Sequence, residues 1–287
     1  MGDETVMPEK LLYIVGTAAA TLIVLWMASA VIARLFVRRY IGKLLRSVGR
    51  ESLPRFSAQR ITSLPVAVQR YLTYALKEGQ PNIRYAILKQ TAEFRHGANR
   101  PWISVRATEY LSGMEPGFVW DAVLRHHALW WRTAKLGYVQ GTGKGHIKLF
   151  GALTLEEFQG KETNESMLFR FLSELVWLPT GLLPTHTLQW RHINHNTALA
   201  VITDGQTRID AEFHVNEIGQ VEKITTNSKY RDTKSGFEPT SFTMLCKDYA
   251  EVEGVMIPQQ VVFVWNLPEG DLEYGKFHVT DIVYHYT

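Results

Sequence analysis

The sequence contains a single cysteine, Cys246, so no intramolecular disulfide can form and packing alone must hold the fold. The surrounding residues, TMLCKDY, favour a small buried strand residue over a nucleophile, because free cysteine is among the most buried residue types. The sequence also lacks a large excess of either charge, since 31 basic and 28 acidic residues leave a formal net charge of +3. Nucleic acid is therefore not an expected partner unless the basic residues gather in one place.

The short motifs by which common enzyme classes are recognised are absent too. The sequence has no Gly-x-Ser-x-Gly elbow, no His-Glu-x-x-His pair and no dinucleotide fingerprint. The glycine-rich segment GTGKGH, Gly141 to His146, resembles an anion-binding loop, but Gly145 follows Lys144 where a phosphate loop needs Ser or Thr. We interpret this segment as a strand turn, and we expect no enzymatic activity and no cofactor.

Metal-ligand clusters are equally scarce. His126 and His127 are neighbours, and neighbouring residues on a strand point to opposite faces. His192 and His195 have a spacing that suits a helix or turn, but no cysteine and no acidic cluster near them completes a ligand set. The sequence therefore predicts no metal site, and its histidines are expected at the surface or in hydrogen bonds.

One long hydrophobic run stands near the N-terminus. After a tail, residues 1–10, whose charges are mainly acidic, residues 11–33 read LLYIVGTAAATLIVLWMASAVIA without a charge. A helix of about 20 apolar residues spans the roughly 30 Å hydrocarbon layer of a membrane. We predict a transmembrane helix over residues 11–33. The alternative is a cleaved signal sequence, because Ala28 to Ala30 resembles a cleavage site.

Basic residues follow this run directly, in a juxtamembrane helix or linker over residues 34–62. They are Arg34, Arg38, Arg39, Lys43, Arg46 and Arg50, with no acidic residue before Glu51. Basic residues beside a spanning helix normally stay in the cytoplasm, which predicts a single-pass protein with its domain on that side. The segment fits equally a helix along an anionic lipid surface and a solvated extension of the membrane helix.

Residues 63–287 have the pattern of one β-rich domain. A short helix is predicted within residues 63–81, and beyond it segments such as WISVRATEYL and TRIDAEFHV alternate apolar and polar residues, as strands with one buried face do. Residues 164–178 instead have apolar residues at helical spacing, and Pro179 ends that pattern. We expect a mainly β fold with minor α, in which a curved antiparallel sheet covers its apolar face with the inserted helix.

Two consecutive segments, RFLSELVWLPTGLLP and LQWRHINHNTALAVITD, resemble the signature of an uncharacterised bacterial family. The blocks LPVAVQRYL, PGFVWDA, GYVQGTGKGHIKLFGAL, GVMIPQQVVFVW and HVTDIVYHY are similar to the other blocks of that family, in the same order. The resemblance covers nearly all of the chain after residue 62. It implies a fold like the half-barrel of lipoprotein carriers, the LolA type, with helices and an apolar groove inside, and it implies no established activity.

Two positions depart from the family pattern. Lys135 and Leu136 stand where the family usually has an Asp, and Thr240 and Phe242 stand near the place of a usual Trp. If these positions serve a ligand common to the family, its binding is lost or altered in this chain.

Five residues are candidates for a ligand groove. Arg170 and Glu174 lie four residues apart, on one face of the predicted inserted helix, where they can pair. Such a pair either pins the helix under the sheet or makes a polar contact at the mouth of a groove. Trp120, Trp177 and Trp190 are the aromatic candidates, because tryptophan lines cavities as well as cores.

These features predict a membrane-anchored, non-catalytic module of the bacterial inner membrane that binds a lipid, an acyl chain or another apolar ligand. The first alternative is an accessory or scaffolding subunit of a larger membrane complex. It is suggested by the small residues that permit close helix packing, which are Gly16, Ala18, Ala19, Ala20, Ala28, Ser29 and Ala30. The second alternative, an enzyme acting on lipid, has no motif to support it.

Overall fold

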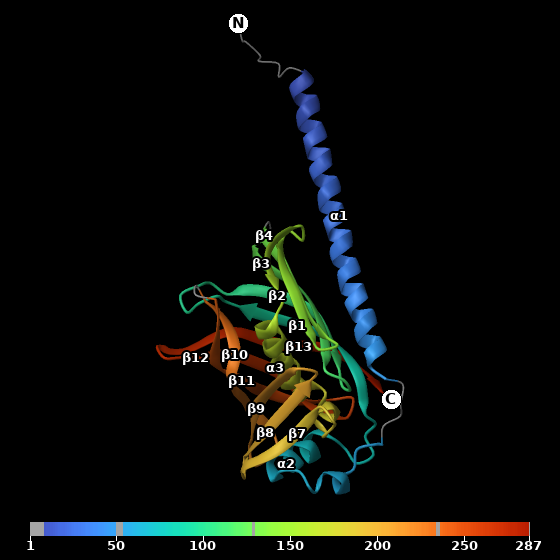
Figure 1. Cartoon of the computed structure of the whole chain (residues 1–287), viewed down its shortest axis with the longest axis vertical. Coiled ribbons are helices and arrows are strands. Elements are labelled where there is room, and N and C mark those ends of the chain that lie inside the picture. The colour runs from blue at the N-terminus through green and yellow to red at the C-terminus, as the bar shows by residue number, and fades with distance from the viewer. Residues whose placement is uncertain (1–8, 50–53, 128–129, 234–235, 287) are drawn as a thin grey trace.

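The computed structural model describes residues 9–49, 54–127, 130–233 and 236–286, and combines three α-helices with a large sheet (Figure 1). The helices are α1 (Glu9–Ser47), α2 (Val66–Ala75) and α3 (Lys161–Glu174), with 3-10 turns η1 (Ala58–Ile61), η2 (Leu175–Trp177) and η3 (Pro179–Leu182). The strands are β1 (Ile83–Phe94), β2 (Ile103–Ser112), β3 (Gly117–His127), β4 (Trp130–Val139), β5 (Thr142–Leu149), β6 (Leu153–Phe158), β7 (Leu188–Asn194), β8 (Thr197–Asp204), β9 (Thr207–Val215), β10 (Val221–Thr233), β11 (Gly236–Val252), β12 (Val255–Leu267) and β13 (Gly270–Tyr286).

The thirteen described strands form one antiparallel sheet in the order β6-β5-β4-β3-β2-β1-β13-β12-β11-β10-β9-β8-β7. Strands that are neighbours in sequence pair with each other, except β6 and β7. Strand β1 also pairs with β13, which places Ala86 opposite Tyr284 and Phe94 opposite Gly275. The two edges, β6 and β7, are the strands that flank α3 in the sequence. The sheet curves into a half-barrel around α3 (Figure 1), which confirms the predicted fold class.

Helix α3 crosses the concave side of the sheet and packs against β4, β5, β9 and β10. Its first half is polar, and its second half carries the buried apolar side chains, which are Met167, Leu168, Phe169, Phe171 and Leu172. Strand β5 comes so close to α3 that a Cβ on Gly143 would lie 2.9 Å from the Met167 sulfur. The glycine-rich segment is therefore a turn and a strand that pack against a helix, as predicted.

Cys246 is buried in β11, as its sequence context indicates.

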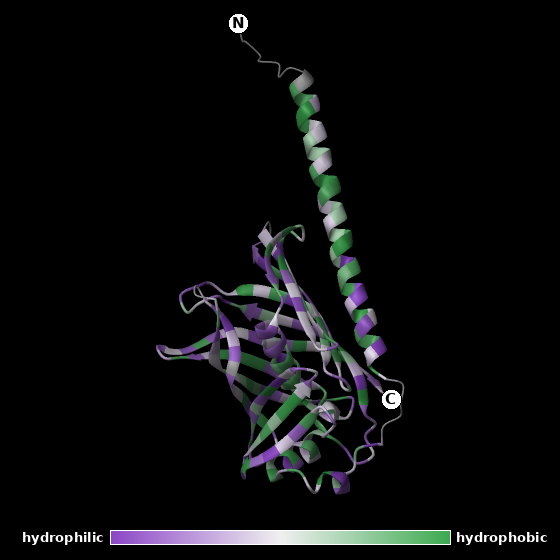
Figure 2. Ribbon diagram, viewed as in Figure 1, coloured by the Kyte–Doolittle hydropathy of each residue, from purple (hydrophilic) through white to green (hydrophobic). Residues whose placement is uncertain are grey.

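Helix α1 continues without a break through the predicted boundary at residue 33, and its 39 residues make it about 58 Å long. Among the described residues it is the one helix with the length and composition to cross a membrane. Its first half is apolar and exposed, whereas its second half lies against the convex face of the sheet at β2, β3 and β4 (Figure 2). Val37 and Leu44 of α1 form a small separate core with Val119 and Val139.

The basic residues of α1 lie mainly on the side that faces away from the sheet. Arg34, Arg38, Arg39 and Arg46 are exposed. Lys43 is partly buried, with its amine 5.8 Å from the centre of the Tyr40 ring. Arg50 lies outside the described residues. The second half of α1 is thus an extension of the apolar helix that is docked on the sheet on one side and solvated on the other.

Two glycines allow α1 to dock this closely. A Cβ on Gly117 would lie 2.5 Å from Cδ1 of Leu44, and a Cβ on Gly137 would lie 3.0 Å from Cδ1 of Tyr40. Strands β3 and β4 therefore present bare backbone where the helix places its larger side chains.

We predict that Gly117→Ala lowers the stability of the full chain by about 1–3 kcal/mol, because the added methyl group overpacks the contact with Leu44. Thermal unfolding in mild detergent, followed by tryptophan fluorescence, measures the change. Gly97→Ala is the control, since its new Cβ would meet only the Arg100 side chain at 3.6 Å. Equal unfolding temperatures for the two variants would contradict the prediction.

Candidate ligand cavity

A cavity of about 440 Å³ lies between α3 and the concave face of the sheet. This volume falls within the roughly 300–1,000 Å³ range of small-molecule pockets. Its apolar lining comprises Phe94, Val105, Trp120, Leu124, Ala134, Leu136, Ile147, Phe158, Met167, Phe237, Phe242, Phe263, Tyr274 and Phe277. Its charged lining comprises Arg132, Glu156, Glu162, Arg170, Lys229 and Asp232. The cavity is thus an aromatic chamber with a few ionisable groups.

A chain of polar contacts connects α3 to the first three strands at the wall of this cavity. The guanidinium of Arg170 donates from Nε to Glu174 Oε1 at 2.8 Å and from Nη2 to Glu109 Oε1 at 3.0 Å. Gln90 donates to the other oxygen of Glu109 at 2.8 Å, and the Trp120 indole donates to Gln90 at 2.9 Å. The guanidinium carbon also lies 4.9 Å from the centre of the Trp120 ring. Arg170 is therefore held by both ionic and aromatic contacts.

One guanidinium in this cluster faces two carboxylates that are almost without exposed surface. Burial, followed by the nearby charge of Glu174, raises the pKa of Glu109 well above its ordinary value. The Arg170 guanidinium donates to both acids, and Gln90 donates to Glu109 as well. A buried cluster whose charges are paired and hydrogen-bonded in this way is compatible with an apolar ligand beside it.

Another cation in the lining, Lys229 of β10, has a different environment from Arg170. Its amine lies 4.2 Å from the centre of the Phe242 ring and 5.2 Å from that of Phe169, with Phe263 and Trp265 each at 6.0 Å. None of the described residues forms an ion pair with it. Burial, followed by the charge of Arg170, lowers the pKa of Lys229 to about 7. Lys229 therefore presents to the cavity a cation that is surrounded mainly by aromatic rings.

A second hollow, of about 470 Å³, lies between Pro54–Phe56 and the residues around η3. The charged residues in its wall, Arg55, Arg60 and Glu115, are all exposed. Because it has neither the aromatic lining nor the buried ionisable groups of the cavity beside α3, the latter is the stronger candidate site.

Residues 62–284 match one protein family, whose description is a family of unknown function, DUF6920. This chain belongs to the DUF6920 family. The matched region begins after α1 and contains α3, Arg170, Lys229 and all of the sheet except the last two residues of β13. A search of curated proteins found no match to the chain.

Solved structures with a similar arrangement are all remote in sequence from this DUF6920 protein. One is a domain from Vibrio parahaemolyticus assigned to outer membrane lipoprotein sorting, with 10% identity, a TM-score of 0.43 and coverage of 80% of this chain and 94% of that one. A DUF1329 protein from Desulfovibrio piger has 8% identity, a TM-score of 0.42 and coverage of 76% and 90%. A LolA superfamily protein from Nitrosomonas europaea has 9% identity, a TM-score of 0.40 and coverage of 77% and 93%.

The DUF6920 structure places the five predicted groove residues in two groups. Trp120 and Arg170 line the cavity, and Glu174 lies behind Arg170 in the i, i+4 pair that the sequence predicts. Trp177 and Trp190 are not among the lining residues. Trp177 has no exposed surface and donates to the carbonyl of Pro258 at 2.9 Å, while Trp190 packs edge-on against Phe213. These two side chains pack in or against the hydrophobic core and lie outside the cavity lining.

Sequence reasoning missed Gln90, Glu109 and Lys229. A signal existed for the first two, because Gln90 stands in phase with the buried residues of β1 and Glu109 in phase with those of β2. A polar residue on the apolar phase of a strand marks a buried polar group. No such signal exists for Lys229, because an irregularity in the pairing of β10 between Thr226 and Lys229 changes the phase.

The residues that depart from the expected family pattern lie in different parts of the structure. Lys135 is nearly buried and pairs with Asp121 on the neighbouring strand, and it is not part of the lining. Leu136 and Phe242 do line the cavity, and the Phe242 ring lies beneath Lys229. An aromatic ring is thus present in the cavity near the position where a tryptophan was expected.

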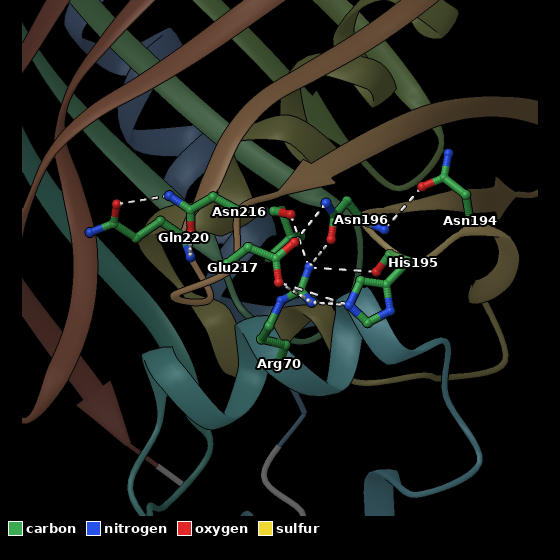
Figure 3. Close-up of polar contacts among 8 residues, drawn as sticks. Arg70, Asn194, His195, Asn196, Asn216, Glu217 and Gln220 are labelled. Atoms are coloured by element: carbon green, nitrogen blue, oxygen red, sulfur yellow. Dashed lines mark hydrogen bonds and ion pairs between the residues drawn. The ribbon is translucent and has the colours of Figure 1, made fainter.

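A second polar cluster lies far from the cavity, at the end of the half-barrel where α2 docks (Figure 3). Arg70 of α2 donates to Asn196 Oδ1 at 2.6 Å and to the carbonyl of Val215 at 3.0 Å, and it contacts His195 at 3.1 Å. Its partners come from the β7–β8 turn and the end of β9, which Arg70 ties to α2. We assign this cluster a structural role, because its hydrogen bonds connect α2 to the β7–β8 turn and to the end of β9.

The lowered pKa of Lys229 gives a pH-dependent stability with a definite sign. The unfolded chain holds this proton up to pH about 10.4, whereas the folded chain releases it at about 7. Between these values the unfolded state binds more protons than the folded state. The free energy of unfolding therefore rises with pH, and the destabilisation caused by burying the charged Lys229 is lost. Lys229→Met should therefore be most stabilising, relative to the native chain, below pH 7, with a difference that shrinks toward pH 10.

Thermal unfolding of both proteins from pH 6 to pH 10 measures this difference. Lys223→Met is the matched control, because Lys223 lies on the same strand with an exposed side chain. A difference for Lys229→Met that stays constant with pH would contradict the prediction.

Proposed function

We propose that this DUF6920 protein is a membrane-anchored, non-catalytic module that holds an acyl chain, a lipid or a similar apolar ligand in the half-barrel. The observation that carries the proposal is the aromatic cavity beside α3, in whose wall Arg170 is already paired with Glu109 and Glu174. Each methylene of a ligand that leaves water for such a surface contributes about 0.8 kcal/mol.

The first half of α1 supports the anchoring part of the proposal. Its side chains from Leu11 to Ile32 are exposed or half-buried, and many of them are large and apolar, with Tyr13 77% and Leu22 68% exposed. Apart from the contacts of Trp26 and Ser29 with residues 150–152, the described part of the chain leaves this surface uncovered. A hydrocarbon layer satisfies this surface without any protein partner.

Photolabelling with a palmitic acid that carries a diazirine in mid-chain tests both parts. The full chain is placed in phosphatidylcholine nanodiscs with the probe, irradiated and digested, and the labelled peptides are identified by mass spectrometry. We expect label on α1, which reports anchoring, and on β2, β11 and β12, which face the cavity.

Val105→Phe should reduce labelling of the cavity strands several-fold, because Val105 lines the cavity and the larger ring fills part of it. Ser104→Phe is the matched control, since adjacent strand residues point to opposite faces and Ser104 is exposed outside. Labelling of α1 should be the same in both variants. Cavity labelling that Val105→Phe leaves unchanged, or label on α1 alone, would contradict ligand binding.

We further propose that the domain lies on the cytoplasmic side of the bacterial inner membrane. The support is the basic cluster on the exposed side of α1, Arg34, Arg38, Arg39 and Arg46, which resists translocation. A cysteine at Ile218, which is 65% exposed, reports the side directly. In intact spheroplasts, Ile218→Cys should stay unlabelled by a membrane-impermeant maleimide and react only after lysis. Reaction before lysis would place the domain in the periplasm.

The competing proposal is an accessory subunit whose α1 packs against other membrane helices. One observation favours it: around Gly16 a Cβ would meet no atom within 4 Å, so a neighbouring helix can approach closely there. Purification in mild detergent distinguishes the two, because an accessory subunit co-purifies with its partners in fixed ratio and a solitary module does not.

A further inference from the structure

The turn between β5 and β6 is fastened to the apolar half of α1. The indole of Trp26 donates from Nε1 to the carbonyl of Phe150 at 2.8 Å. The hydroxyl of Ser29 lies 3.2 Å from the carbonyl of Gly151 and 3.4 Å from that of Ala152. Three consecutive turn carbonyls therefore lie at the level of Trp26 to Ser29, well inside the segment proposed to span the membrane.

The length of α1 fixes where this level falls in a bilayer. The fifteen residues from Leu11 to Leu25 give a helix of only about 22 Å at 1.5 Å per residue, too short for a hydrocarbon layer of roughly 30 Å. The layer cannot shift toward the N-terminus, because Glu9 and Lys10 precede Leu11. It must therefore extend to about residue 30, past Trp26, and any tilt of the helix extends it further.

The side chains around the turn suit that environment. Leu153 and Leu155 of β6 are 62% and 42% exposed, and Trp130 at the start of β4 is 41% exposed. The Phe150 ring packs edge-on against Trp130 and Trp131, with centroid distances of 5.2 and 4.9 Å. Exposed leucines beside a group of indole rings are typical of the boundary between acyl chains and head groups.

The backbone carbonyls of the turn also accept hydrogen bonds from side chains of α1, which suits a medium with little water. A carbonyl in hydrocarbon costs several kcal/mol if it has no donor. The Trp26 indole donates to the carbonyl of Phe150, and the single Ser29 hydroxyl proton is shared between the carbonyls of Gly151 and Ala152. Five residues further along α1, about 7.5 Å from Ser29, Arg34 is exposed where lipid phosphates would lie.

From these observations we infer that the β5–β6 turn, together with Trp130 and Trp131, inserts into the acyl and head-group boundary of the leaflet on the domain side. The domain thus has a second membrane contact beside its anchor. This inference rests on the proposed anchoring by α1. Strands β3 to β6 also carry Leu124 and Ile147 of the cavity lining, so the contact holds the cavity close to the bilayer.

Depth measurements on nitroxide labels test the inference. Single cysteines replace Leu153 or Leu155 on β6, Leu22 on α1, and Ile218 on the β9–β10 turn, in full chains that carry Cys246→Ala. Each labelled protein is placed in vesicles of phosphatidylcholine and phosphatidylglycerol. Power saturation then compares collisions with oxygen, which concentrates in lipid, and with a nickel chelate, which stays in water.

We expect the labels at Leu153 and Leu22 to collide preferentially with oxygen and the label at Ile218 with nickel. The label at Leu155 should show a shallower depth than that at Leu153, because it lies further from the turn. Labels at Leu153 and Leu155 that collide with nickel as often as Ile218 does, while Leu22 remains in lipid, would overturn the inference and leave the anchor intact. A label at Leu22 that collides with nickel would instead remove the anchor itself.

Discussion

The pairing of the first strand with the last strand determines how the rest of this molecule is arranged. Without the β1–β13 ladder, β1–β6 and β7–β13 would be two separate meanders. With it, they form one sheet whose edges, β6 and β7, are neighbours in sequence but lie at opposite ends of the sheet. The chain must therefore cross the concave side between them. A helix is suited to that crossing because it satisfies its own backbone groups while its side chains cover the apolar face.

The same crossing creates the polar cluster and the cavity. Helix α3 carries Arg170 to the wall formed by β1, β2 and β3, where Glu109, Gln90 and Trp120 receive it. On its other side α3 approaches Lys229 of β10, which belongs to the second meander. The space enclosed between these contacts is lined by aromatic rings and is too large for α3 alone to fill. The Arg170 ion pairs and the cavity therefore both result from the path of α3 across the sheet.

Much of the fold was predictable because it depends on local patterns. The composition and spacing of residues 11–33 and 164–178 predict helices, and the alternation of apolar and polar residues predicts the sheet. The four-residue spacing of Arg170 and Glu174 predicts their ion pair. The site was less predictable, because Glu109 meets Arg170 only through the strand order, which no local pattern reveals. Lys229 depends on an irregularity in strand pairing. Trp177 is fully buried, and the sequence does not separate a core position from a groove position there, because a large aromatic residue after a helix fits either.

The uninterrupted path of α1 has a mechanical consequence. Because the helix continues without a break from its apolar half to the surface it shares with β2, β3 and β4, no flexible joint separates the domain from the apolar segment. The orientation of the half-barrel relative to that segment is consequently fixed, to within the bending of a single helix. Under the proposed anchoring, the half-barrel therefore keeps one height above the lipid, and a ligand of the proposed kind has to reach it by lateral diffusion in the leaflet or on a mobile protein.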